Sequence, residues 1–134
     1  MTLQVEVVSP ERILYSGEAD SVIARTVGGG EIAFLTGHAQ FVGALDIATV
    51  TIRAEAGDTV LAVHGGFVEV SHDTVTVLSD VAELGDDIDV DRAEQAKSEA
   101  EQRLARDEDD EAEAAVRRAD VRLTAANGPG GTGH

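Results

Sequence analysis

The spacing of apolar residues changes once along this 134-residue chain, near residue 88. Before that point apolar and polar residues alternate, as in residues 48–55, where Val50, Ile52 and Ala54 are separated by polar residues. Such alternation predicts a strand with one buried and one solvated face. After residue 88 apolar residues recur every three or four positions, which predicts amphipathic helices. The sequence therefore predicts a β domain followed by a helical domain.

The β domain is expected to cover residues 1–86. Turn residues, among them Ser9-Pro10, Gly65-Gly66 and His72-Asp73, separate its alternating runs, and no helical pattern interrupts them. This arrangement predicts an antiparallel β-sandwich of about eight to ten strands, so the fold class is α+β. The predicted strands cover residues 3–8, 12–16, 20–27, 31–35, 48–55, 59–65, 67–71 and 74–80.

The helical domain is expected to be an antiparallel two-helix hairpin over residues 87–126. Its helices are predicted within 88–107 and 109–126, with Asp89 as the N-cap of the first. Their apolar stripes consist mostly of alanine, which buries little area, so we expect the hairpin to be weakly held. This pattern fits a stabilising appendage or an element with two docking positions. Residues 127–134, rich in glycine, are predicted to be a disordered tail.

Composition argues against several classes of function. A net charge of −16 and an aromatic content of 3% disfavour nucleic-acid binding, which relies on basic and stacking side chains. The chain has no cysteine, so a disulfide framework and a thiolate nucleophile are excluded. No apolar run is long enough to span a bilayer.

No catalytic or metal-binding motif is visible in the sequence. The phosphate-binding, dinucleotide-binding and nucleophile-elbow patterns are missing, and the histidines lack metal-ligand spacing, so no metal is expected. His64 alternates in phase with Val60 and Ala62, which predicts a partly buried strand histidine. A small hydrolase using His64 or His72 is a further alternative.

Arg117, Arg118 and Arg122 form a basic cluster on the second predicted helix. The simplest interpretation is a solvated helix face that balances nearby acidic residues. The alternative is a contact with an acidic protein surface or a polyphosphate, because guanidinium groups bind carboxylates and phosphates through paired hydrogen bonds.

Four segments, taken in order, resemble the epsilon subunit of bacterial F-type ATP synthases over residues 2 to about 125. They are VEVVSPER with LYSGEAD, GGEIAFLTGHAQFVGAL, HGGFVEVSHDTVTVLSD and IDVDRAEQAK. The resemblance implies a non-catalytic rotor subunit in the central stalk, with no active site and no required cofactor. Its location would be peripheral, at the cytoplasmic face of the bacterial membrane, with membrane contact only through the complex.

The resemblance also implies partners. The sandwich would pack on the gamma subunit and touch the c-ring, with Glu31 and His38 in that contact region. The hairpin would restrain ATP hydrolysis when extended, with Arg117, Arg118 and Arg122 facing the alpha and beta catalytic subunits.

Some family members bind regulatory ATP on the folded hairpin through an Ile-Asp-x-x-Arg-Ala motif. The residues that carry this site over are Ile88, Asp89, Arg92 and Ala93, with Glu83 and Arg122 as additional contacts. An N-cap and a helix stripe would also explain Asp89 and Ala93. The competing hypothesis for the whole chain is a free-standing β-sandwich that binds a small ligand and dimerises through its helices.

Overall fold

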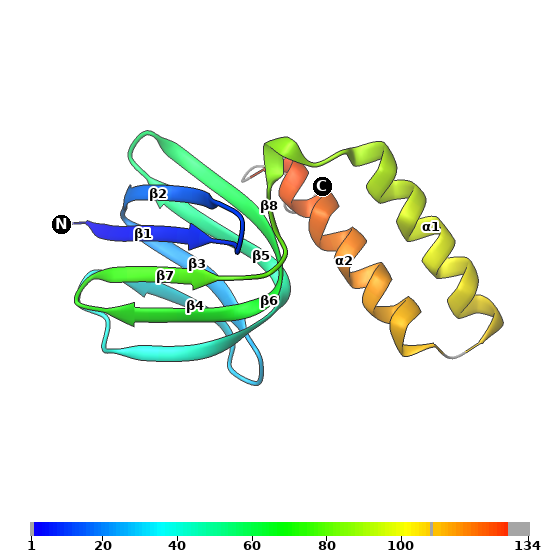
Figure 1. Cartoon of the computed structure of the whole chain (residues 1–134), viewed down its shortest axis with the longest axis horizontal. Helices are drawn as coiled ribbons and strands as arrows, with labels where there is room; N and C mark the ends of the chain where they lie inside the picture. Colours follow the sequence, from blue (N-terminus) through cyan, green and yellow to red (C-terminus); the bar gives the residue numbers. More distant parts are fainter. Residues whose placement is uncertain (1, 108, 129–134) are drawn as a thin grey trace.

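The computed structural model describes residues 2–107 and 109–128, which form a β domain followed by two helices (Figure 1). The strands are β1 (Leu3–Val8), β2 (Ile13–Ala19), β3 (Ser21–Thr26), β4 (Gly30–Leu35), β5 (Phe41–Ala54), β6 (Gly57–Ser71), β7 (Thr74–Leu78) and β8 (Ala82–Leu84). A short 3-10 helix, η1 (Gly85–Asp87), leads into α1 (Val90–Arg106) and α2 (Asp110–Asn127).

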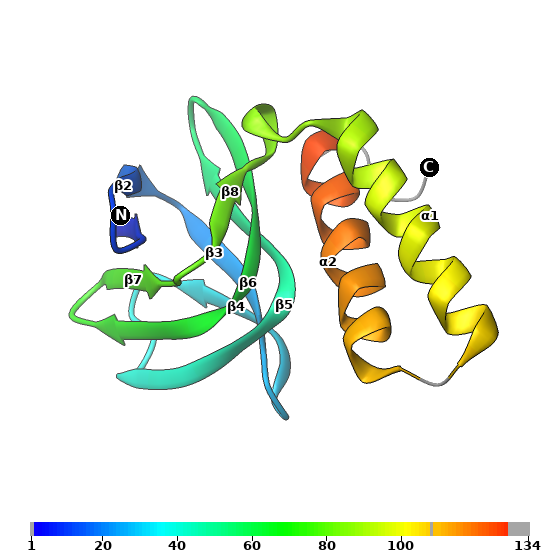
Figure 2. The ribbon, with the colours of Figure 1, turned by 45° about the vertical axis from the view of Figure 1, so that its right-hand side comes forward.

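The strands form a folded sheet in the order β2-β1-β7-β6-β5-β3-β4, with β8 paired to β6. The long strands β5 and β6 curve from one layer to the other, which closes the sandwich around its core (Figure 2). Neighbouring strands are antiparallel except for the parallel pair β1 and β7. The core consists of inward-facing aliphatic residues and one phenylalanine, among them Leu3, Val22, Phe34, Ile52, Leu61 and Val77. The predicted β-sandwich followed by a helical hairpin is confirmed.

Several strands differ from the prediction. β2 continues to Ala19 rather than ending at residue 16, β5 begins at Phe41 rather than near residue 48, and β8 was not predicted. The predicted turn at Gly65-Gly66 is wrong, because β6 runs through both glycines. Gly66 has a φ of 120°, and a Cβ atom there would lie 2.1 Å from the carbonyl oxygen of Leu78. The glycine pair therefore lets β6 change direction close against the end of β7.

The predicted turn at His72-Asp73 is confirmed, with positive φ angles of 50° and 58°. Such angles suit a tight hairpin turn, in which the left-handed region is required at both central residues. A second turn, which contains Gly37 and follows β4, lies beside it. The Gly37 amide donates a hydrogen bond of 2.7 Å to the Asp73 carboxylate, so the two turns hold each other in place.

The two helices pack side by side, and α2 lies between α1 and the sheet (Figure 2). Asp89 caps α1 as predicted, since its carboxylate accepts a hydrogen bond from the Arg92 amide. Asp109 caps α2 in the same way. The buried residues of the pair are all alanines: Ala93, Ala100, Ala112, Ala119 and Ala125. α2 extends through Asn127, and the predicted disordered tail lies, from residue 129 on, outside the described residues.

Candidate functional site

The seam between α2 and the sandwich is narrow. Its buried cluster consists of Val60 and Ala62 from β6 and Ala125 from α2, with Ile88 and Val121 partly buried beside them. Each buried CH2 group contributes roughly 0.8 kcal/mol, so a seam built on small side chains contributes only a few kcal/mol. The hairpin is therefore attached to the sandwich by a small dry contact and by the polar contacts around it.

Gly85 brings the C-terminal end of α2 against the sandwich. A Cβ atom at Gly85 would lie 2.2 Å from the carbonyl oxygen of Ala125 and 3.0 Å from that of Val60. Both neighbours are backbone atoms, which move only if the helix or the strand moves. The absence of a side chain at residue 85 is thus a requirement of the docked position.

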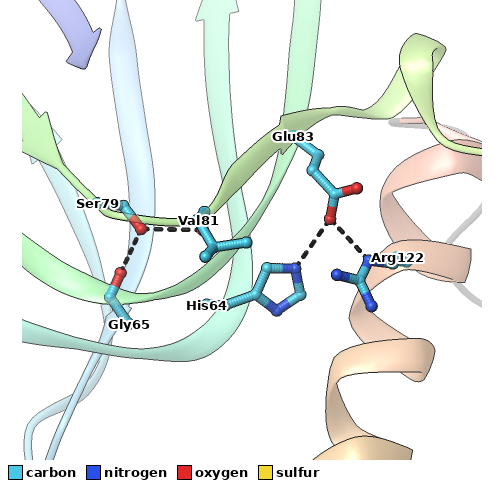
Figure 3. A network of polar contacts seen from close by, with 6 residues as sticks. All are labelled: His64, Gly65, Ser79, Val81, Glu83 and Arg122. Atoms are coloured by element: carbon cyan, nitrogen blue, oxygen red, sulfur yellow. Dashed lines mark hydrogen bonds and ion pairs between the residues drawn. The ribbon is translucent and has the colours of Figure 1, made fainter. Parts of the chain in front are cut away.

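Three charged or titratable side chains link the sandwich to α2 beside this seam (Figure 3). The Glu83 Oε1 atom, on β8, accepts hydrogen bonds from Arg122 Nε at 2.7 Å and from His64 Nε2 at 3.1 Å. His64 lies in β6 and its side chain is only 4% exposed, so it is a strand histidine as predicted, with a side chain more buried than the partly buried one expected. One carboxylate therefore joins β6, β8 and α2.

The local environment lowers the pKa values of both His64 and Glu83. Burial, the largest effect, lowers the pKa of His64, and the nearby charges of Arg122 and Arg118 lower it further against the opposing hydrogen bond to Glu83. Burial alone would raise the pKa of Glu83, but hydrogen bonds from Arg122 and His64 lower it overall. At neutral pH the cluster is a neutral imidazole, a carboxylate and a guanidinium.

A cavity of about 540 Å³ opens at the junction of β8, α1 and α2. Five of the six residues predicted for a nucleotide site line it: Glu83, Ile88, Asp89, Arg92 and Arg122. The sixth, Ala93, is buried in the helical domain and is not among the lining residues. Asp87 and Ala96 complete the wall. The cavity thus combines two guanidinium groups with three carboxylates, one of which caps α1.

The three arginines of α2 all contact acidic residues of the same chain. Arg122 binds Glu83 of β8, and Arg117 Nη1 lies 3.9 Å from an Asp46 carboxylate oxygen on β5. Arg118 pairs with Glu111, which lies two helical turns earlier on α2. Two of the three contacts therefore bridge the hairpin and the sandwich, and both would be lost if α2 left the sheet.

The other predicted contact residues, Glu31 and His38, lie at opposite ends of the edge strand β4. Glu31 is exposed near its start, opposite Arg25 of β3. His38 follows its end, and its ring lies edge-on to Phe34 with centroids 5.0 Å apart. From Glu31 to Leu35 the strand rises by roughly 13 Å, at about 3.3 Å per residue. The structure does not bring these two residues together.

An apolar row on the outside of the sandwich was not predicted from the sequence. The strand registers place Ile13, Val8, Leu78 and Phe67 side by side across β2, β1, β7 and β6. Ile13 and Phe67 are each 59% exposed and Leu78 is 49% exposed. A groove of about 350 Å³ runs beside the row over Gly65 and Gly66. The sequence does contain one indication of this row. Phe67 and Leu78 are large apolar residues that alternate out of phase with the inward-facing valines of their strands, so they must face outward.

Family models match both parts of the chain. Residues 2–85 match the β-sandwich domain of the ATP synthase delta/epsilon chain. Residues 86–127 match the long α-helix domain of the same chain. The chain belongs to the ATP synthase delta/epsilon family.

Curated relatives in this family are similar over most of their length. The ATP synthase epsilon chain of Streptomyces griseus is 47% identical over 124 residues, which are 92% of this chain and 94% of that relative. The ATP synthase epsilon chain of Brevibacillus brevis is 50% identical over 103 residues, 76% of this chain and 77% of that relative.

Solved structures of ATP synthases contain chains with the fold of this delta/epsilon family member. A chain of the Euglena gracilis mitochondrial ATP synthase has a TM-score of 0.70 and 21% identity, covering 91% of this chain and 75% of that one. A chain of the Tetrahymena thermophila central stalk and c-ring has a TM-score of 0.52 and 16% identity, covering 69% of this chain and 70% of that one. Within the described residues, neither helix has the length and apolar character needed to cross a membrane.

Proposed function

We propose that this chain is the non-catalytic epsilon-type subunit of the central stalk in a proton-translocating F-type ATP synthase. The observation that carries the proposal is the pairing, in one chain, of both matched domains in the order sandwich then hairpin. In this role the chain transmits rotation between the catalytic head and the c-ring. It is a peripheral component at the cytoplasmic face of the bacterial membrane.

The sandwich carries the contacts with the rotor. The apolar row of Ile13, Val8, Leu78 and Phe67 is the surface expected to pack on the gamma subunit, because exposed rows of large apolar side chains mark protein interfaces. The edge strand β4, with Glu31 on its outer face and His38 beyond its end, is the surface expected to meet the c-ring and gamma.

The hairpin carries the regulation. In the docked position Arg117 and Arg122 pair with Asp46 and Glu83 of the sandwich. When α2 extends, these guanidinium groups become available to acidic loops of the alpha and beta subunits and restrain ATP hydrolysis. Exchange between two positions requires comparable free energies, and the narrow seam around Val60 and Ala125 keeps the docked position within reach of competing contacts.

ATP is proposed as a regulatory ligand of the docked hairpin, without hydrolysis. The cavity at the junction of β8, α1 and α2 supplies Arg92 and Arg122 for phosphates and is lined by residues of both domains. A ligand that contacts both domains binds only the docked state and therefore stabilises it. Three carboxylates in the same wall oppose the phosphate charge, so the expected affinity is weak.

Removal of residues 88–134 tests whether the sandwich alone binds the rotor and whether the hairpin restrains ATP hydrolysis. Added to a synthase core that lacks its own epsilon-type subunit, the full chain is expected to bind, to restore proton coupling and to lower ATP hydrolysis. The truncated chain is expected to bind and couple but to leave hydrolysis several-fold higher than the full chain does, because the restraining helix is missing. Failure of the full chain to bind the core would favour the free-standing module, and failure of the truncated chain alone would show that assembly needs the hairpin.

Titration of the isolated chain with ATP tests the regulatory ligand. Binding measured by calorimetry is expected to saturate in the wild type and to weaken at least about tenfold in Arg122→Ala, since one charge-assisted phosphate contact is lost. Arg53→Ala, an exposed arginine on β5, is the matched control and is expected to bind as the wild type does. If all three proteins bound ATP equally, or if none of them bound it, ATP would not be a ligand of this cavity.

A further inference from the structure

His64 is buried at the hairpin seam with only one of its two ring nitrogens satisfied. Its Nε2 atom is bonded to Glu83, whereas its Nδ1 atom is buried and has no hydrogen-bond partner among the described residues. The backbone fixes the residue, because the His64 amide donates to the Val81 carbonyl at 3.0 Å. With α2 docked, the His64 side chain is only 4% exposed, and Arg122 and Arg118 of α2 lie near its ring.

The charges that face His64 come from two elements. β8 contributes Glu83, and α2 contributes Arg122 and Arg118. On the paired strand β5 the residue opposite His64 is the uncharged Ile47, and the neighbouring Asp46 faces Arg117. One carboxylate and two guanidinium groups thus surround the ring, and the carboxylate already accepts a hydrogen bond from Arg122.

Adding a proton at Nδ1 would place a new donor and a positive charge in this site. The donor would be buried without an acceptor, which costs on the order of 1–3 kcal/mol for a polar group and more for a charged one. Departure of α2 removes both arginines and uncovers the ring, so the undocked state accepts the proton more easily. We propose that His64 is a proton-sensitive anchor of the hairpin, whose protonation favours the undocked position of α2.

The direction of the pH dependence follows from the docked and undocked states. An exposed histidine titrates near pH 6.5, and the pKa of His64 in the docked state is lower. The neutral ring therefore supports docking fully above about pH 6.5, and this support is lost as the pH falls from there toward the docked value. The pKa of Glu83 is lowered as well, which favours its ionised carboxylate as the pH falls. The pH-dependent undocking is independent of the proposed function, whereas an effect of undocking on ATP hydrolysis would rest on it.

Distance measurement between two spin labels tests the anchor in the full chain. The chain has no cysteine, so Glu55→Cys on the sandwich and Glu101→Cys on α1 give two unique, exposed labelling sites. At pH 7.5 pulsed EPR is expected to give mainly the docked distance. At pH 5.5 the population with longer distances is expected to grow about threefold or more, because docking is linked to proton release.

His64→Gln, which keeps an amide donor and does not titrate, is expected to lose this response. His72→Asn is the matched control and is expected to keep it, because asparagine tolerates the positive φ of residue 72.

An NMR titration of the wild-type imidazole should give a His64 midpoint that coincides with the midpoint of undocking. The inference is overturned if the wild-type distances do not change with pH, if His64→Gln still responds, or if the two midpoints disagree. If pH moves the hairpin but removal of residues 88–134 leaves hydrolysis unchanged, the proposed restraint fails and the anchor stands.

Discussion

Replacing Gly85 with alanine is expected to release the hairpin from the sandwich without unfolding either part. The new Cβ atom would lie 2.2 Å from the Ala125 carbonyl oxygen, so the end of α2 must move away. The buried seam includes Ala125 itself, and its loss removes part of a contact that contributes only a few kcal/mol. We expect the docked population to fall at least about tenfold, equivalent to roughly 1.4 kcal/mol. Hydrogen exchange should then be faster in α2 and unchanged in the sandwich core.

Asp86→Ala is the matched control for this substitution. Asp86 is the next residue of η1, and it is exposed, so its truncation removes no packing. In the Asp86→Ala protein, the backbone amides of α2 are expected to exchange hydrogen at the wild-type rate. Equal protection of α2 in Gly85→Ala and in the wild type would show that the close approach of Gly85 and Ala125 does not hold the hairpin.

Replacing Gly66 with alanine is expected to destabilise the sandwich itself. The residue has a φ of 120°, which non-glycine residues rarely adopt, and a Cβ atom would lie 2.1 Å from the Leu78 carbonyl oxygen. Backbone strain of this kind costs on the order of 1–3 kcal/mol, and forced displacement of packed neighbours costs a similar amount. We therefore expect the free energy of unfolding to fall by about 3 kcal/mol and the Tm to fall by roughly 10–20 °C.

Gly17→Ala provides the comparison, because it also lies in a strand. A Cβ atom there would make ordinary contacts of 3.7 Å or more with the Tyr15 side chain, and its φ is compatible with alanine. Its Tm is expected to stay within a few degrees of the wild type. A Gly66→Ala protein as stable as Gly17→Ala would mean that β6 does not need a glycine where it bends.

The features that sequence predicts here are local ones. Alternation fixes which residues of a strand face inward, so the short strands β1 and β7 were predicted nearly to the residue. The start of α1 was predicted because an N-cap aspartate satisfies helix amides that have no other partner. By contrast, five residues of the candidate nucleotide cavity were predicted from the family resemblance rather than from a local pattern.

The features that sequence does not predict depend on which strands pair. Gly65-Gly66 has the composition of a turn, and only its pairing with β5 and the approach of Leu78 make it a bend within β6. The parallel pairing of β1 and β7 joins segments about 70 residues apart, and no local pattern specifies it. The apolar row likewise exists only once four strands are aligned. His64 was predicted to be a partly buried strand histidine, but its link through Glu83 to Arg122 depends on the position of α2.

In the proposed function, a rigid sandwich holds the rotor while the hairpin exchanges between the sandwich and the catalytic subunits. A covalent bridge between hairpin and sandwich tests this exchange most directly. Asp46→Cys and Arg117→Cys place two thiols on either side of the docked interface in a chain that otherwise has none. The measurement is ATP hydrolysis by the assembled complex before and after a short crosslinker with two thiol-reactive groups alkylates both cysteines. We expect crosslinking to raise hydrolysis to the level seen without residues 88–134, because a hairpin locked on the sandwich cannot restrain the catalytic subunits. An unchanged or lower rate of hydrolysis would contradict the proposed exchange.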